Sequence, residues 1–231
     1  MWNKNIFQTY ECDFEELHES FKKCCNLWKN TYPDWKYCFK NPKERREEVI
    51  DILCLSPIEA EIYDNYSGMT QSDIWRYSVT CFYGGMYADL DSIPILNIEP
   101  ILHELNDTIE MVALPNGDQI NGLPGSNNCN FILKSHSEIG LSLLADVKKQ
   151  FEENEERLKN NEKPKKTPTH HELFRKTVAF NRSKVAQIFD QRYVTHGRDY
   201  KPDTDYRLRN EKQINHSYFI EEYCNCLWCQ Q

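Results

Sequence analysis

Two aspartates separated by one residue, Asp89 and Asp91, are the side chains of this sequence best suited to chemistry. Carboxylate oxygens are hard ligands of the kind that Mg²⁺ and Mn²⁺ prefer. Because side chains alternate along a strand, both carboxylates are expected on one face of the strand that they end, with Leu90 directed into the core. The pattern suits a divalent cation that holds a diphosphate. Two solvated acids at an exposed strand end are the alternative.

An acid and an arginine lie ahead of these aspartates, on a predicted helix over residues 72–82. Asp73 and Arg76 are three residues apart, so they are neighbours on one face of that helix. Ser72 suits the N-cap position. In the functional interpretation, Asp73 binds a sugar or ribose hydroxyl and Arg76 lies near sugar or phosphate oxygens, which match the guanidinium fork. The alternative is an ordinary surface ion pair.

The elements that must position these residues alternate along the chain. Gly84 and Gly85 are expected to end the helix and turn the chain directly into the strand. Apolar patterns predict strands at 5–9, 35–39, 86–90, 111–114 and 130–133, and helices at 14–29, 44–55, 58–66, 72–82, 139–151 and 172–178. Residues 152–166 are either a solvated helix extension or a loop, and 189–193 and 218–220 resemble late strands. This order predicts one α/β domain over residues 1–231.

Composition limits the classes of function. The 231 residues carry a net charge of −8, which argues against general nucleic-acid binding, where a basic surface is expected. Neither a secretory signal nor an apolar run long enough for a transmembrane helix is found. The ten cysteines are therefore expected to be reduced thiols. We expect a cytoplasmic protein, of a bacterium or of a virus-infected host cell.

Four short segments, in this order and spacing, resemble the DXD-containing sugar-binding glycosyltransferases. They are residues 6–9, 32–37, 72–77 and 83–91, which read IFQT, YPDWKY, SDIWRY and YGGMYADLD. That family, glycosyltransferase family 32, includes the yeast initiating α-1,6-mannosyltransferase, and it is distantly similar to the glucosylating domain of large clostridial toxins. The resemblance covers residues 5 to 95 and is loose beyond residue 125.

The resemblance implies a GT-A type fold, with a mixed, mainly parallel sheet flanked by helices. It also implies a nucleoside-diphosphate sugar donor, with uridine or guanosine as the base, and a requirement for Mn²⁺ or Mg²⁺. A glycan or another hydroxyl compound is the implied acceptor. The implied reaction moves a hexosyl unit to that hydroxyl with retention of configuration, in glycan or polysaccharide synthesis.

The same resemblance assigns site residues. The implied catalytic residues are Asp89, Asp91 and Arg76. The implied metal ligands are Asp89, Asp91 and His216, the last in a late loop. The implied donor-binding residues are Phe7, Gln8, Thr9, Ser72, Asp73, Arg76, Tyr77, Gly85, Asp89, Asn128 and Asn130.

Two other classes of function are open. A phosphohydrolase or phosphotransferase with a DXD motif usually has a nucleophilic aspartate after its first strand, whereas Gln8 and Thr9 end that strand here. A non-catalytic protein of the same fold, binding a nucleotide sugar or a carbohydrate, is the main alternative. The presence of Asp73, Arg76 and both DXD aspartates argues against it.

Overall fold

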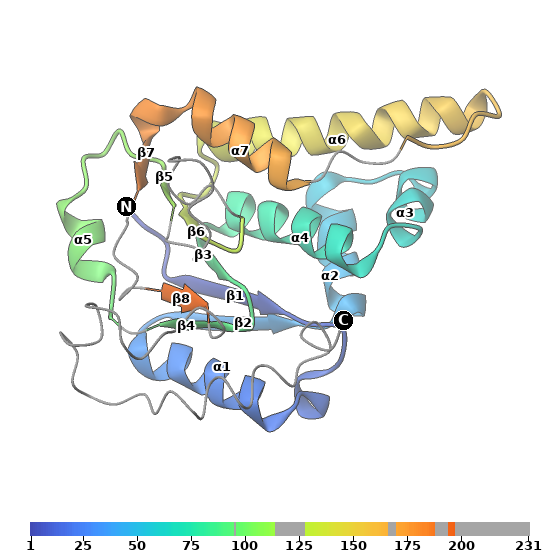
Figure 1. Cartoon of the computed structure of the whole chain (residues 1–231). Coiled ribbons are helices and arrows are strands. Elements are labelled where there is room, and N and C mark those ends of the chain that lie inside the picture. The colour runs from blue at the N-terminus through green and yellow to red at the C-terminus, as the bar shows by residue number, and fades with distance from the viewer. Residues whose placement is uncertain (95, 114–127, 166–169, 188–193, 197–231) are drawn as a thin grey trace.

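The chain is built around a six-stranded sheet with the order β2-β1-β3-β6-β5-β7 (Figure 1). The computed structural model describes residues 1–94, 96–113, 128–165, 170–187 and 194–196. The strands of this sheet are β1 (Asn5–Thr9), β2 (Lys36–Lys40), β3 (Gly85–Ala88), β5 (Met111–Ala113), β6 (Asn130–Leu133) and β7 (Val185–Gln187). Since β6 is antiparallel to β3 and β5 and the other neighbours are parallel, only β6 is reversed. The expected mixed, mainly parallel sheet is confirmed.

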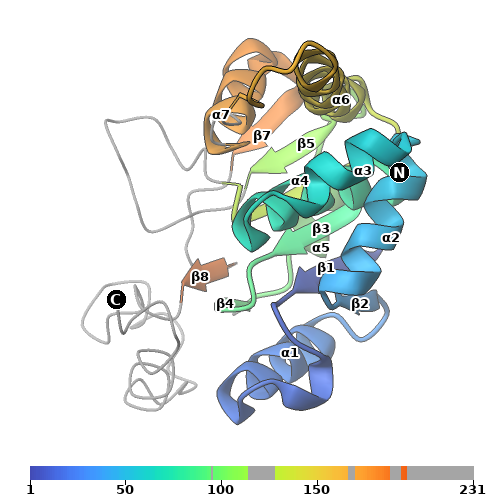
Figure 2. The same ribbon diagram turned by 90° about the vertical axis from the view of Figure 1, so that its right-hand side faces the viewer.

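Helices cover both faces of the sheet (Figure 2). The α-helices are α1 (Glu19–Thr31), α2 (Pro42–Leu53), α3 (Pro57–Asp64), α4 (Gly68–Tyr83), α5 (Glu99–Glu104), α6 (Glu138–Lys159) and α7 (His170–Phe180). The remaining elements are the 3₁₀ turns η1 (Phe14–Glu16) and η2 (Arg182–Lys184), and a small sheet of β4 (Ser92–Pro94) and β8 (Val194–His196). Helix α1 packs on one face, and α2, α4, α6 and α7 pack on the other.

The central strands bury both of their faces. Phe7 and Tyr87 join the core beneath α4, whereas their neighbours Ile6 and Met86 join the core beneath α1. This alternation follows from the period of two along a strand, and burial on both sides explains why the strands read as almost continuous apolar runs. The sheet is thus a rigid base, and the residues that follow its strands are held in place by it.

Helix α4 begins earlier than the sequence predicted. Its N-cap is Ser67, whose hydroxyl accepts a hydrogen bond from the Thr70 amide, so the prediction that Ser72 is the N-cap was wrong. Ser72 lies in the second turn of the helix and is buried. The end of α4 agrees with expectation, because Gly84 ends it with φ +69° and Gly85 follows with φ +124°.

Other boundaries also differ from the predicted ones. The predicted helix 14–29 is split, because the chain is extended at Leu17 and α1 starts after His18, whose ring accepts from the Ser20 amide. The strand that precedes the two aspartates ends at Ala88 rather than at residue 90. Helix α6 continues to Lys159, so the first of the two alternatives for residues 152–166 holds up to that residue. The predicted strands at 189–193 and 218–220 lie outside the described residues.

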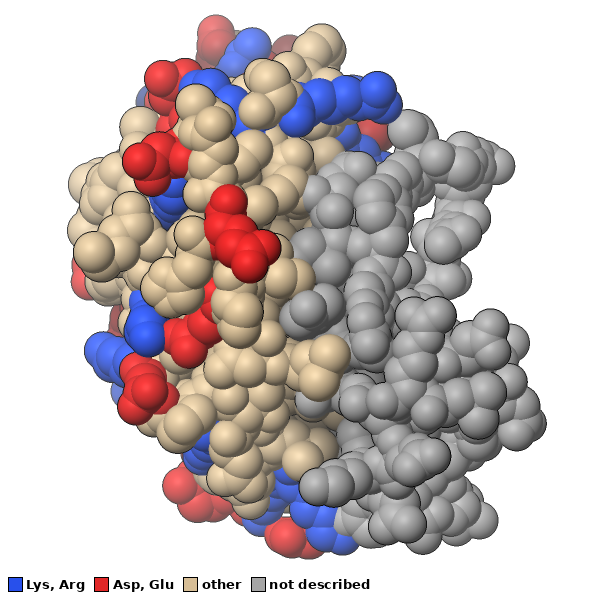
Figure 3. Space-filling model, turned by 90° about the vertical axis from the view of Figure 1, so that its left-hand side faces the viewer, with Lys and Arg blue, Asp and Glu red and all other residues tan. Residues whose placement is uncertain are grey.

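The described surface is mixed in charge. Acidic and basic side chains are interspersed over the face drawn in Figure 3. The seven cysteines in the described ranges are free thiols. Of the helices that the structure describes, none combines the length and the apolar character needed to cross a bilayer.

A candidate active site at the carboxyl edge of the sheet

The two aspartates lie where β1, β2 and β3 end and β6 begins. Because β3 ends at Ala88, Asp89 and Asp91 belong to a turn, so strand alternation does not set the direction of their carboxylates as predicted. Hydrogen bonds from the neighbouring segments hold the turn instead. The Asp89 amide donates to the Cys129 carbonyl at 2.9 Å, and the Gln8 side chain donates to the Asp89 carbonyl at 3.1 Å. Leu90 is buried in the core, as expected. The backbone of the turn is therefore fixed from both neighbouring strands.

Arg76 is the buried cation of this edge. Its guanidinium lies 3.2 Å from Asp73 Oδ1 and 3.4 Å from Asp89 Oδ1, and it donates to the Asn128 carbonyl at 2.7 Å. The same group lies over the Tyr87 ring, 4.2 Å from its centroid. A guanidinium in a fork geometry suits two carboxylates at once. Arg76 thus joins the acid of helix α4 to the first aspartate of the turn.

Asn128 completes the cluster from the segment before β6. Its amide nitrogen donates to Asp73 Oδ1 and to the Tyr77 hydroxyl, at 2.8 Å each. The Tyr87 hydroxyl donates to Asp89 Oδ1, also at 2.8 Å. The structure therefore brings together residues that stand far apart in the sequence.

Electrostatics keep these groups in fixed protonation states. Burial acts to lower the pKa of Arg76, but Tyr87, Asp89 and Asp73 outweigh it and hold that pKa well above its ordinary value. Burial raises the pKa values of Tyr77 and Tyr87 well above the ordinary phenol value. Consequently the guanidinium is charged and both phenol hydroxyls are protonated at neutral pH.

Comparison with known proteins identifies this part of the chain. Residues 18–107 match the family described as the glycosyltransferase sugar-binding region containing a DXD motif, and the match includes Asp73, Arg76 and both aspartates of the turn. This part of the chain is similar to the DXD-type glycosyltransferases. The resemblance inferred from the sequence is confirmed. No curated protein matches the sequence.

A solved structure titled "PaToxG Glycosyltransferase" has a similar fold. Its TM-score is 0.50 at 12% sequence identity, and the alignment covers 78% of this chain and 69% of that one. At this identity the likeness concerns the fold alone. Together with the sheet described above, it confirms the GT-A-like fold.

The three residues that end β1, which were predicted to bind the donor, are buried. Phe7 is buried in the core, where its ring packs edge-on against Trp75. Gln8 is buried and accepts from the Tyr37 hydroxyl while it holds Asp89. The Thr9 hydroxyl donates to the Lys40 carbonyl at 2.6 Å. Their side chains position the edge of the sheet.

Two more of the predicted donor-binding residues, Gly85 and Asn130, lie at opposite ends of the β3–β6 pair. Gly85 starts β3, at the opposite end of that strand from Asp89, and a Cβ there would lie 2.6 Å from the Asn5 carbonyl oxygen. The structure therefore explains Gly85 by close strand packing and does not bring it to the donor site. Asn130 pairs with Ala88 at the correct edge, and its buried amide atoms have no partner among the described residues.

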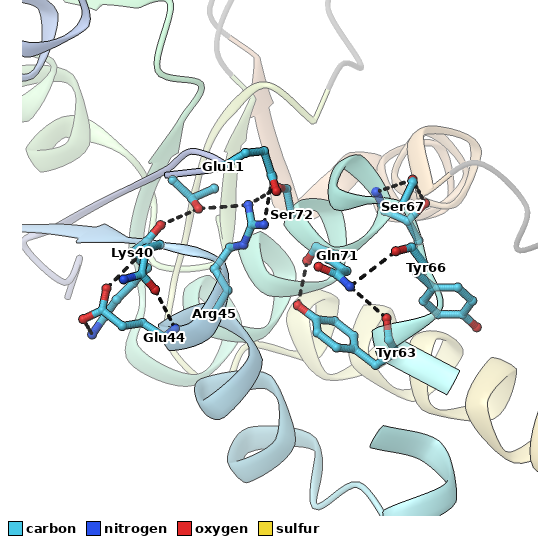
Figure 4. Close-up of polar contacts among 12 residues, drawn as sticks. Glu11, Lys40, Glu44, Arg45, Tyr63, Tyr66, Ser67, Gln71 and Ser72 are labelled. Carbon is cyan, nitrogen blue, oxygen red and sulfur yellow. Dashed lines mark hydrogen bonds and ion pairs between the residues drawn. The ribbon is translucent and has the colours of Figure 1, made fainter. Parts of the chain in front are cut away.

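Sequence reasoning missed Arg45, Glu11 and Tyr87. Arg45 lies on α2 and is fully buried, with hydrogen bonds to Thr9, Ser72 and Glu11 (Figure 4). In the sequence it stands in the charged run KERREE. The only sign that it faces inward is that it lies four residues before Val49, on the same face of the helix. Tyr87 was visible as part of the motif, but its bond to Asp89 depends on where the strand ends.

The residues at the turn fit a divalent cation. Asp89 and Asp91 are both partly exposed and offer hard oxygen ligands. Among the described residues no group of three His, Cys, Asp or Glu side chains forms. Mg²⁺ is commonly bound by one or two carboxylates together with substrate phosphates and water, so two aspartates are a sufficient protein contribution. His216, the third predicted ligand, lies outside the described residues.

A separate cleft of about 990 Å³ lies between α3, the start of α4 and the end of α6. Its lining includes Ile58, Tyr66, Thr70, Leu158 and Lys165, and none of the predicted site residues. It is thus distinct from the glycosyltransferase site at the turn.

Proposed function

We propose that this glycosyltransferase moves a hexosyl unit from a nucleoside-diphosphate sugar to an acceptor hydroxyl, with the help of a divalent cation. The observation that supports this most strongly is the buried Arg76 held between Asp73 and Asp89 directly beside the DXD turn. A buried cation that orients two carboxylates at a sheet edge is a built arrangement, unlike a solvated ion pair. It prepares carboxylate oxygens to receive sugar or ribose hydroxyls.

Asp73 is assigned to the donor sugar or ribose. Its two contacts within the described part of the chain, from Arg76 and from Asn128, fall on Oδ1, so Oδ2 is assigned to a hydroxyl of the donor. Arg76 is only 6% exposed and acts mainly by orienting the two acids. The Asn130 amide, which has no hydrogen-bond partner among the described residues, adds a reason to expect a polar ligand here, because a buried amide without partners carries a desolvation cost that such a ligand removes.

Asp91 and Asp89 would hold the cation, which would neutralise charge on the leaving diphosphate. In the transfer, the bond between the anomeric carbon and the diphosphate oxygen breaks, and a bond from that carbon to the acceptor oxygen forms. The acceptor's proton passes to the leaving diphosphate or to solvent. Retention of configuration follows from the family resemblance, with the acceptor approaching on the same face as the leaving group.

Hydrolysis of a panel of uridine and guanosine diphosphate sugars, with and without Mn²⁺, tests this proposal. The wild type should release nucleoside diphosphate only when Mn²⁺ is present. Asp91→Asn should reduce the rate by about 100-fold or more, because it removes a charged oxygen from the site where charge develops. Asp146→Asn, an exposed residue on α6, is the matched control and should be unaffected.

Two further measurements distinguish the other classes of function. Calorimetric binding of a nucleotide sugar without turnover would favour a non-catalytic binding protein. Release of phosphate from simple phosphate esters would favour a phosphohydrolase. Full activity of Asp91→Asn would contradict the role of that carboxylate in holding the cation.

A further inference from the structure

Arg45 is a buried cation that contacts two of the predicted donor-binding residues, Thr9 and Ser72. It is fully buried on α2, and one of its terminal nitrogens donates to Ser72 Oγ at 2.5 Å and to Thr9 Oγ1 at 3.1 Å. The other terminal nitrogen donates to Glu11 Oε1 at 2.8 Å. One side chain thus links the end of β1, the chain just after it and the second turn of α4 (Figure 4).

The carboxylate that balances Arg45 is held against the start of α4. A Cβ on Gly68, the first residue of that helix, would lie 2.7 Å from Glu11 Oε2, so the glycine makes room for this carboxylate. A negative charge at a helix N-terminus is favourable. Glu11 is 53% exposed, so Arg45 is paired at the rim of the protein while its guanidinium lies inside. A buried charge with one half-exposed partner is costly, and simple packing would not require it.

The direction of these hydrogen bonds is fixed by chemistry. A guanidinium has donors and no acceptor, so the oxygens of Ser72 and Thr9 must both accept. Thr9 gives its own proton to the Lys40 carbonyl. The proton of Ser72 is turned away from Arg45, and no acceptor for it is found among the described residues. Ser72 immediately precedes Asp73, which is assigned to the donor.

We propose that Arg45 is a positioning residue for the nucleotide sugar. By donating to Ser72 it fixes that hydroxyl as a hydrogen-bond donor aimed at an acceptor oxygen of the bound nucleotide sugar, and it holds this turn of α4 against the end of β1. This inference rests on the proposed function, since it concerns the binding of the same donor.

A double-mutant cycle measures whether Arg45 acts through Ser72. The four proteins are the wild type, Arg45→Lys, Ser72→Ala and the double variant. Their dissociation constants are measured by calorimetry with UDP-glucose and GDP-mannose in the presence of Mn²⁺. Each single change should weaken binding of whichever sugar the wild type prefers by about tenfold, the value of one good hydrogen bond. The double variant should bind no more weakly than Ser72→Ala alone.

The adjacent Arg46 provides the matched control. It lies on the same helix, its side chain is 43% exposed, and it pairs with Asp64 at 2.6 Å, so Arg46→Lys should leave binding unchanged. Urea unfolding of every variant shows whether it is folded at the temperature of the binding measurement. If Arg45→Lys does not fold, Glu11→Gln replaces it in the cycle. That variant keeps an acceptor but removes the charge that holds Arg45, and it should weaken binding about threefold, again only when Ser72 is present.

The outcomes separate this inference from the proposed function. Additive losses in the cycle, or losses that follow the unfolding free energies alone, would overturn the role of Arg45 while leaving the proposed function standing. If the wild type binds none of the nucleotide sugars, the proposed function fails and the role of Arg45 fails with it. Coupling between the two positions without an effect at Arg46 supports the inference.

Discussion

At the scale of single residues, the charge balance of the site depends on the neutral side chain of Asn128. The side-chain nitrogen of Asn128 donates hydrogen bonds to both the Asp73 carboxylate and the Tyr77 hydroxyl. Asp73 and Asp89 already share one cation, Arg76. Two carboxylates already outnumber this one guanidinium, so a third acid here would add to the excess of negative charge, and a neutral donor suits the position.

Asn128→Asp should therefore destabilise the protein in a pH-dependent manner. The introduced carboxylate faces Asp73 and loses the donated hydrogen bonds, which we expect to lower the free energy of unfolding by about 2–4 kcal/mol at pH 8. Repulsion raises the pKa of the introduced acid in the folded state. The part of the loss that comes from repulsion should therefore be complete at high pH and should disappear as the pH falls to about 4, the pKa of an unfolded aspartate.

Asn128→Ala is the comparison for this prediction. It removes the same donors without adding a charge, so its loss of stability should be about 1–2 kcal/mol and should not vary between pH 4.5 and pH 8. Urea denaturation at several pH values measures both variants. Equal pH dependence of the two would contradict the charge balance described above.

Part of this cluster could be predicted from the sequence. Asp73 and Arg76 are neighbours because of helical spacing alone, and they do form an ion pair. The contact of Arg76 with Asp89 depends on the pairing of β1 with β3, and its bond to Asn128 crosses 52 positions. Such contacts follow from tertiary packing, which local patterns do not contain.

At the scale of elements, two glycines join α4 to β3 for different reasons. Gly84 ends the helix in a left-handed conformation. Gly85 has φ +124°, and a Cβ on it would lie 2.6 Å from the backbone oxygen of Asn5 on the neighbouring strand. A backbone atom in a sheet cannot move aside as a flexible side chain can. The strand pairing that supports the DXD turn therefore requires a glycine there.

Gly85→Ala should be strongly destabilising. The strained φ and the contact with the backbone together should lower the free energy of unfolding by about 3 kcal/mol or more. Gly68→Ala is the comparison, because its φ is helical and its new methyl group would displace only the flexible end of Glu11. We expect it to lower the free energy of unfolding by about 1 kcal/mol, less than Gly85→Ala, because Glu11 must shift against Arg45. Thermal and urea unfolding compare the two, and similar losses would contradict this explanation.

Element boundaries show why the sequence could predict most elements but not their ends. The strand at residues 5–9 was predicted with the bounds that the structure has, since apolar side chains and flanking polar residues mark it clearly. The start of α4 was misplaced because both Ser67 and Ser72 are good N-caps. The Ser67 hydroxyl accepts from the backbone amide three residues on, whereas the Ser72 hydroxyl accepts from Arg45 of another helix.

At the scale of the whole molecule, three partly or fully buried carboxylates tie distant segments together. Glu99 on α5 binds Lys4 at 2.6 Å and also the Trp35 side chain. Glu59 on α3 binds Lys148 of α6 at 2.6 Å, and Glu110 binds Lys184 at 2.9 Å. These pairs join the residue before β1 to α5, α3 to α6, and the residue before β5 to η2. They hold the outer helices and turns in place around the sheet that carries the site.

Each of these acids has a pKa below the ordinary glutamate value. For Glu99 the hydrogen bond from Lys4 is the main cause. For Glu59 and Glu110 burial acts to raise the pKa, but hydrogen bonds outweigh it, from Lys148 and the Ser56 amide to Glu59 and from the Ile139 amide and Lys184 to Glu110. A carboxyl group whose folded pKa is lowered stabilises the protein above its unfolded pKa. That stabilisation is lost as the pH falls through the folded value.

The protein should therefore lose stability as the pH falls below about 4.3, the pKa of an unfolded glutamate. Glu59→Gln should be less stable than the wild type by about 1–3 kcal/mol at pH 7, because the amide cannot pair with Lys148. That difference should shrink as the pH falls, since the wild type loses the same interaction when Glu59 is protonated. The exposed Glu152→Gln on α6 should follow the wild type at every pH. Urea unfolding between pH 3 and pH 7 measures this. A constant difference between Glu59→Gln and the wild type would show that the carboxylate charge does not hold α3 to α6.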